Sequence, residues 1–178
     1  MRRIYPLFLC LSLSFTIISH AQESYDKLNL GIGFGADFGG IGGNLTVYPQ
    51  KNLGLFFGGG YAFAGFGYNA GLKYRFLPSK PSSQFTPYIL AMYGYNAAVH
   101  VSNASQYDKM FYGPTIGVGC DLGSHVVGKG AFSIALLIPI RSSEPNDYID
   151  HLRSDYGIEF KNKLIPIGFS FGYKFNLD

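Results

Sequence analysis

A histidine and a serine stand two residues apart at His100 and Ser102, at the outer end of an expected β-strand. Alternate residues of a strand point to the same side, so this spacing would bring a base and a hydroxyl together. Glu144 or Asp147 from a later loop would then orient the imidazole, as the third member of a catalytic set does. Because a His-x-Ser pair often arises by chance, the spacing alone does not predict catalysis, and we expect no enzymatic activity.

Charged side chains are a second set of candidates, because several occupy positions that would face the inside of a barrel. Near the inner end of the expected strands these are Lys73, Arg75, Asp121 and Lys174, and near the outer end they are Asp37 and Arg141. Inward charges line a permeation path in some membrane proteins and pair with one another in others. In a narrow lumen an isolated charge is costly, so we expect these charges to form ionic networks.

Glycines and histidines offer little further chemistry. Gly31, Gly33 and Gly35 alternate within an expected strand, and no helix pattern follows them, unlike the glycines of a nucleotide-binding loop. We expect them to leave room inside a narrow barrel. His125 and His151 fall in loops on opposite sides of the expected barrel, so a shared metal site is not expected. The sequence therefore predicts no metal site and no cofactor.

The first residues have the pattern of a secretory signal peptide. Arg2 and Arg3 precede an apolar stretch, and Ser19, His20 and Ala21 form a small-x-small cleavage site. The apolar stretch is shorter than the roughly 20 residues that a membrane-spanning helix needs. We therefore expect a cleaved signal peptide at 1–21 and one folded domain at 22–178.

Charge and composition exclude some classes of protein. Without the leader, 12 basic and 11 acidic residues remain and no basic cluster survives, which argues against nucleic-acid binding. Cys120 would be the only cysteine left, so no intramolecular disulfide is expected. With 24 Gly, 14 Tyr, 16 Phe and only 14% charged residues, the composition is unusual for a water-soluble helical domain.

Polar and apolar residues alternate with a period of two in segments separated by turn-like stretches. In residues 165–175 large apolar side chains share one face, while small or polar side chains share the other. Residues 28–38 repeat this pattern, with Phe38 at the end of the apolar face. Such segments are typical of a transmembrane β-barrel, with lipid outside and a crowded lumen inside.

The pattern predicts eight strands, at residues 28–38, 41–48, 55–64, 67–76, 85–99, 111–122, 131–141 and 165–175. The first and last would pair to close an all-β, antiparallel, up-and-down barrel with both termini on the periplasmic side. The last outer loop is expected to hold a short helix, with Ser143 as its cap, Pro145 in its first turn and Gly157 at its exit. This segment would cover the outer mouth, lie at the lipid headgroups or, as we expect, pack as a loop.

Aromatic residues cluster at the expected strand ends, where a membrane barrel has its interfacial girdles. They are Tyr61, Phe63, Tyr93 and Tyr95 at the outer rim, and Tyr74, Phe76, Tyr173 and Phe175 at the inner rim. The alternative, an aromatic core of a soluble barrel, would not place them at strand ends.

The signal peptide, the alternating strands and the run from Gly168 to Phe175 resemble the small bacterial outer-membrane β-barrel family, similar in plan to OmpX, OmpW and the transmembrane domain of OmpA among the porin-like barrels. The resemblance implies a Gram-negative cell envelope, with outer-membrane lipid, lipopolysaccharide and the barrel-assembly machinery as partners, and a monomer. One departure is that Asn176, Leu177 and Asp178 follow Phe175, whereas the family usually ends on an aromatic residue.

The sequence specifies function less well than fold. Our first hypothesis is an integral outer-membrane protein with a structural or surface-interaction role. The alternatives are a narrow channel for small or hydrophobic solutes, a lipid A-modifying enzyme that uses His100 and Ser102, and a soluble periplasmic barrel of the lipocalin kind.

Overall fold

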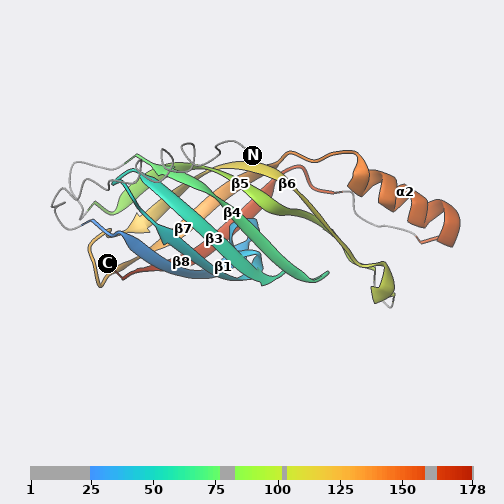
Figure 1. Cartoon of the computed structure of the whole chain (residues 1–178), viewed down its shortest axis with the longest axis horizontal. Helices are drawn as coiled ribbons and strands as arrows, with labels where there is room; N and C mark the ends of the chain where they lie inside the picture. The colour runs from blue at the N-terminus through green and yellow to red at the C-terminus, as the bar shows by residue number, and fades with distance from the viewer. Residues whose placement is uncertain (1–24, 77–82, 102–103, 159–163, 178) are drawn as a thin grey trace, which may run out of the picture.

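The computed structural model describes residues 25–76, 83–101, 104–158 and 164–177. In these residues the chain forms eight antiparallel strands that close into a barrel in sequence order, as predicted (Figure 1). The strands are β1 (Leu28–Gly35), β2 (Gly40–Val47), β3 (Leu53–Tyr61), β4 (Phe66–Arg75), β5 (Phe85–Val99), β6 (Lys109–Gly123), β7 (Gly130–Pro139) and β8 (Gly168–Asn176). The predicted signal peptide at 1–21 and the first residues of the domain expected at 22–178 lie outside the described residues.

The first and last strands pair and close the barrel, as the sequence predicted. Their register runs from Asn29 opposite Asn176 to Phe34 opposite Phe171. Closure gives every strand a neighbour on both sides, so within the barrel the sheet has no free edge. We call the end where β1 begins and β8 ends the terminal end, and the opposite end, from which β5 and β6 project, the lobe end (Figure 1).

Side chains on the strands alternate between a polar inside and an apolar outside. On β4, Asn69, Lys73 and Arg75 are buried, whereas Leu72 and Tyr74 between them are exposed. The same alternation holds along β5, where Tyr88, Leu90 and Met92 are buried and Ile89 and Tyr93 are exposed. This arrangement is the reverse of a water-soluble barrel, because the surface is the apolar face.

The connection between β1 and β2 differs from the prediction. The first strand was expected to run to Phe38 with that ring on the outer face, but β1 ends at Gly35 and a 3-10 helix, η2 (Ala36–Phe38), follows it. This turn folds into the lumen, where Phe38 is fully buried (Figure 1). Gly35 and Gly39 flank it with φ of 138° and 71°, values that favour glycine and permit the reversal. We call η2 the turn plug.

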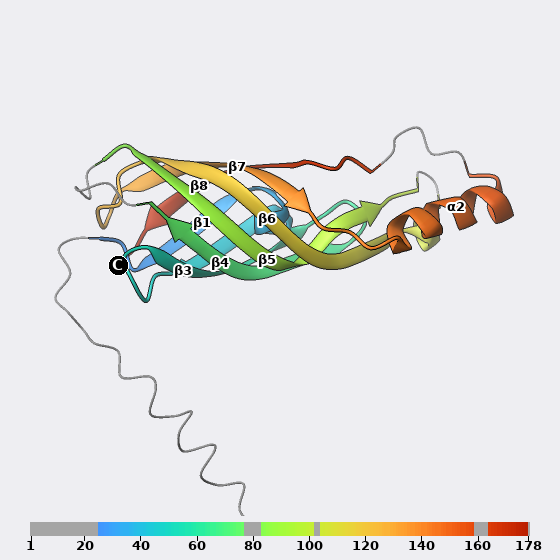
Figure 2. The ribbon, with the colours of Figure 1, turned by 90° about the horizontal axis from the view of Figure 1, so that it is seen from above.

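At the lobe end, β5 and β6 extend past their neighbours (Figure 2). The predicted helix, α2 (Glu144–Tyr156), lies between β7 and β8 in the chain and packs against this extension. A β-bulge separates the barrel part of β5 from its projecting part, between Tyr95 and Ala97. The projecting hairpin and α2 enclose a second apolar cluster, which we call the core of the lobe. Its buried members are Ala97, Val99, Val101, Phe111, Ile149 and Leu152.

The residues at the two ends of α2 match the sequence prediction only in part. Pro145 lies in the first turn and Gly157 ends the helix in the left-handed conformation, as expected. Ser143 occupies the N-cap position but forms no capping hydrogen bond with its side chain, so that part of the prediction was wrong. Its backbone is helical, with φ of −70° and ψ of −22°, whereas a capping side chain normally belongs to a residue with extended backbone.

The packing of the turn plug gives a first prediction. A methyl group on Gly172 would lie 2.9 Å from a ring carbon of Phe38 and 2.8 Å from the carbonyl oxygen of Ile32, too close on both sides. The substitution Gly172→Ala should therefore lower the free energy of unfolding by about 1–3 kcal/mol, measured by urea unfolding of the refolded protein. Gly168→Ala on the same strand meets nothing closer than 3.4 Å and should leave stability almost unchanged. Equal losses in both variants would show that Phe38 does not occupy this position.

Candidate functional site: a filled lumen and a projecting lobe

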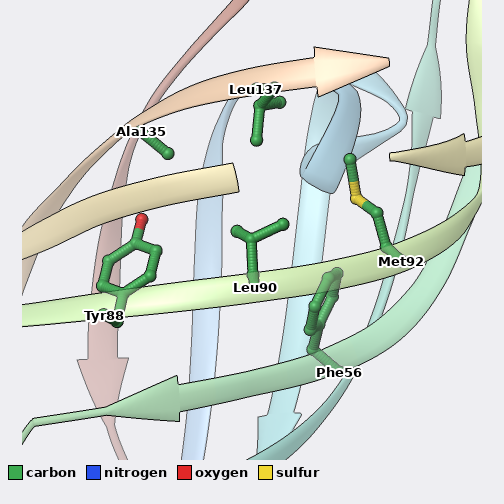
Figure 3. Close-up of a cluster of buried hydrophobic side chains, with 6 residues drawn as sticks. All are labelled: Phe56, Tyr88, Leu90, Met92, Ala135 and Leu137. Carbon is green, nitrogen blue, oxygen red and sulfur yellow. The ribbon is translucent and has the colours of Figure 1, made fainter. Parts of the chain in front are cut away.

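Apolar side chains fill the middle of the lumen, although most of the inward positions are polar. They project from the three strands β3, β5 and β7 and meet around Leu90 (Figure 3). The members are Phe56, Tyr88, Leu90, Met92, Ala135 and Leu137. Each is almost fully buried, so side chains pack closely in the centre of the lumen.

A layer of charges lies beside this cluster, formed by Lys73, Asp121 and Lys174, and we call it the charge layer. The ammonium of Lys73 lies 2.6 Å from Oδ2 of Asp121, and that of Lys174 lies 3.6 Å from Oδ1. Lys73 also lies 3.6 Å from the centre of the Tyr88 ring, whose electron-rich face attracts a cation. One carboxylate and one aromatic ring thus stabilise two buried ammonium groups.

A second polar cluster closes the terminal end, and we call it the terminal plug. Its members are Asp26, Asn29, Arg75, His125 and Asn176. Arg75 holds Asp26 with both terminal nitrogens, at 2.9 Å to Oδ2 and 2.7 Å to Oδ1. Asn29 donates to Oδ2 of Asp26 and to Oδ1 of Asn176, both at 2.7 Å. The cluster therefore connects the segment before β1 with the ends of β1, β4 and β8.

Histidine and tyrosine complete the terminal plug. Nδ1 of His125 lies 3.1 Å from Nη1 of Arg75, and Nε2 lies 2.8 Å from the hydroxyl of Thr86. The ring of Tyr48 lies 3.6 Å from the guanidinium carbon of Arg75, and burial raises the pKa of this tyrosine to about 12. Burial alone would raise the pKa of Asp26, but His125 and Arg75 beside it lower the pKa by more, so it lies below its ordinary value.

The lobe end of the lumen is closed by the turn plug. The hydroxyl of Ser170 donates to the carboxylate of Asp37. The side chain of Asn44 donates to the carbonyl of Asp37, and that of Asn69 donates to the carbonyl of Ala36, each at 2.7 Å. Asp37 and Arg141, both expected to join an ionic network near the outer end, do not contact each other. Arg141 instead donates to the carbonyls of Asn96 and Ile165 at the rim.

The predicted lumen charges thus divide into separate groups. Lys73, Asp121 and Lys174 come together, Arg75 joins the terminal plug, and Asp37 lies in the turn plug. Sequence reasoning missed Asp26 and His125, because the first precedes the barrel strands and the second lies in a turn, where alternation predicts no direction. The polar residues Asn29 and Asn176 did have inward parity, which was the available signal.

The predicted catalytic pair is only partly within the described residues, because Ser102 lies outside them. β5 ends at Val99, so His100 follows the strand instead of belonging to it. Nδ1 of His100 lies 2.9 Å from Oδ2 of Asp108, whereas the prediction named Glu144 or Asp147 as its partner. Oδ1 of Asp108 accepts a hydrogen bond of 2.8 Å from the amide of Val101, and this bond and His100 hold the pKa of Asp108 below its ordinary value.

The outer wall carries the predicted aromatic residues. Most are exposed, namely Tyr61, Phe63, Tyr74, Phe76, Tyr93 and Phe175, while Tyr95 and Tyr173 are half-buried. An apolar groove of about 580 Å³ runs over β4 to β7, and residues that line it include Leu72, Ile89, Ile116, Val118, Leu136 and Ile138. The wall between the two ends is therefore a continuous apolar surface.

Two further features are absent from the described part of the chain. No group of three or more histidine, cysteine, aspartate or glutamate side chains is arranged there to hold a metal ion. None of the helices in these residues is both long and apolar enough to cross a membrane.

No family model matches the chain, and no curated protein matches it either. Among solved structures, it is similar to the N-terminal β-barrel domain of OprF from Pseudomonas aeruginosa, with 14% sequence identity and a TM-score of 0.44. The match covers 85% of this chain and 96% of that chain. A similarity of this degree supports no conclusion about family or function, and the family resemblance expected from the sequence stays a prediction.

The charge layer gives a second prediction. The substitution Asp121→Asn leaves two buried ammonium groups without a carboxylate, so the free energy of unfolding should fall by about 3–5 kcal/mol. Urea unfolding of the refolded protein measures this loss. The matched control is Asp150→Asn on α2, which breaks an exposed pair with Arg153 and should cost at most about 0.5 kcal/mol. A loss at Asp121 no larger than the loss at Asp150 would contradict the buried network.

Proposed function

We propose that the chain is an integral outer-membrane β-barrel with a closed lumen, which holds the lobe at the cell surface in a structural or surface-interaction role and has no enzymatic activity. The observation that carries the proposal is the inverted polarity of the barrel. Its interior holds asparagine, threonine, lysine and aspartate, while its exterior exposes rows of isoleucine, leucine and phenylalanine.

The outer surface supports a lipid environment. Ile32, Phe66 and Phe169 are exposed to 60%, 68% and 64%, and similar side chains surround the barrel. Soluble monomers rarely expose apolar patches larger than a few hundred Å². A lipocalin-like barrel in water would have the opposite arrangement, with these rows inside, so this alternative is disfavoured. Aromatic residues near the strand ends agree with two membrane interfaces.

The proposed cellular location and partners follow from the same reasoning. The expected signal peptide would export the chain, and an exported barrel with an apolar wall is suited to the outer membrane. We propose outer-membrane lipid and lipopolysaccharide as its surroundings, the barrel-assembly machinery as its partner during biogenesis, and a monomer as its state.

The filled lumen argues against the channel alternative. The turn plug, the apolar cluster, the charge layer and the terminal plug occupy the space inside the wall, and most of their polar groups are already hydrogen-bonded. Planar-bilayer recordings separate the two roles, since a closed barrel gives no steady conductance and a channel gives defined steps. With no path through the barrel, the lobe is the part best placed to contact the surroundings.

One observation favours a second candidate, the lipid A-modifying enzyme. The contact between His100 and Asp108 is the kind that orients a general base. The same carboxylate also binds the amide of Val101 and so closes the base of the hairpin loop, which is a structural explanation. Mass spectrometry of lipid A decides between them. Equal spectra from strains with wild-type protein, Ser102→Ala and Asp108→Asn would exclude the enzyme.

The proposed function predicts the behaviour of the protein during extraction. A closed membrane barrel should require detergent for its release and should migrate differently in SDS electrophoresis when boiled and when unboiled, because the closed sheet resists SDS until it is heated. The Asp121→Asn variant should lose this difference at a lower temperature than wild type. Release by osmotic shock without detergent, together with a single mobility, would instead support the soluble periplasmic barrel.

A further inference from the structure

The apolar groove on the outer wall lies between two rows of side chains that are neighbours across the strands β4 to β7. The residues of the first row are Tyr74, Ile89, Val118 and Leu136. Those of the second row are Leu72, Ala91, Ile116 and Ile138. Between the rows, Leu90 and Gly117 lie opposite each other and their backbone forms the floor. The groove is therefore a narrow trough with two side-chain ridges.

The course of the groove follows from the tilt of the strands. Rows of paired residues run across the strands, and the strands of a membrane barrel are tilted by about 35–45° from the barrel axis. The groove reaches Leu53 at the start of β3 and Ile167 just before β8. Since β3 starts at the terminal end and β8 starts at the lobe end, the groove crosses the wall obliquely from one end toward the other.

The chemistry of the groove selects a hydrocarbon chain. Among the described residues that line it, none carries a charge, and the hydroxyl of Tyr74 is the one polar side-chain group. Its volume of about 580 Å³ lies within the range of sites that hold one small ligand, about 300–1,000 Å³. A protein partner would instead need a contact face of about 800 Å². A single flexible chain fits this trough better than a protein surface does.

One position makes the trough wider than the spacing of the strands alone would. Ala91 lies between Leu72 and Ile116 in the second row, and these two larger side chains are exposed to 48% and 47%. The ridge is thus interrupted by a methyl group, and a chain can contact the larger side chains on both sides of it. Lipid tails are as apolar as these residues, so shape and close packing, not the hydrophobic effect, would retain the chain.

We propose that the groove is a binding site for one acyl chain of a phospholipid, whose headgroup lies at the terminal end beside Tyr74. A tyrosine combines an apolar ring with a polar hydroxyl and suits a membrane interface. At the lobe end the groove is lined by Ile138 and Ile167, which offer a headgroup no polar contact. The inference rests on the proposed membrane location, and it names the leaflet at the terminal end as the source of the lipid.

The test uses the mature protein refolded in detergent micelles, with methyl-labelled isoleucine and palmitoyl-oleoyl phosphatidylethanolamine as the probe. The methyl NMR signals of Ile89, Ile116 and Ile138 should shift and saturate at one lipid per barrel. Ile32 and Ile41 are exposed on the wall outside the groove and serve as internal controls. Their signals should shift weakly and without saturation.

A pair of matched variants assigns the binding to the groove. Ala91→Leu fills the gap in the ridge and should weaken the affinity about tenfold, because about ten weak carbon–carbon contacts are lost. Ala70→Leu makes the same change on β4 outside the groove and should bind like wild type. Both alanines are exposed on the outer face, so both variants should fold.

Native mass spectrometry of the wild-type protein identifies the occupant without any variant. One phospholipid per barrel supports the proposal, whereas retention of lipid A in its place overturns it. Equal affinities of the two alanine variants, or uniform shifts over all isoleucines of the wall in a protein that requires detergent, overturn the lipid site alone. A protein that stays soluble without detergent overturns the proposed membrane location and the lipid site together.

Discussion

The lumen of an eight-stranded barrel is wide enough for side chains and little else, and polar groups placed there lose contact with bulk water. This constraint governs the inside of the molecule. Glycines on β1 and β8 make room for Phe38, which would otherwise have no space. Asn44 and Asn69 donate hydrogen bonds to the backbone carbonyls of the turn plug, and Ser170 donates one to the carboxylate of Asp37. Most of the inward polar side chains thus find partners within the lumen, and the outer wall is left to the apolar side chains.

At two levels of the barrel, a buried cation is stabilised by the same pair of contacts, one carboxylate and one aromatic ring. Lys73 and Arg75 are successive inward residues of β4. Lys73 contacts the carboxylate of Asp121 and the ring of Tyr88, while Arg75 contacts the carboxylate of Asp26 and the ring of Tyr48. A carboxylate offsets the charge, and an aromatic face replaces part of the lost hydration. The difference between the two levels is His125, which belongs to the second one alone and lies 3.1 Å from Nη1 of Arg75.

The wall was predictable from the sequence, whereas the plugs were not. Alternation with a period of two specifies which residues of β4 or β8 face outward, because one face meets an apolar environment and the other a polar one. The same pattern continued through Ala36 and Phe38 and misled the prediction, since nothing local distinguishes an outward phenylalanine from one that turns back into the lumen. Asp26 and His125 lie in no strand, so only tertiary structure brings them to Arg75.

In the lobe the apolar side chains are buried in a core, as they are in a soluble protein. The bulge in β5 makes this possible. Up to Met92 the even-numbered residues of β5 face the lumen, but beyond the bulge the odd-numbered Val99 and Val101 are the buried ones. An extra residue shifts the alternation by one, so apolar side chains continue the inner face above the rim. That face would meet water if it were left open. Ile149 and Leu152 of α2 cover it, so the projecting hairpin needs the helix to be stable outside the barrel.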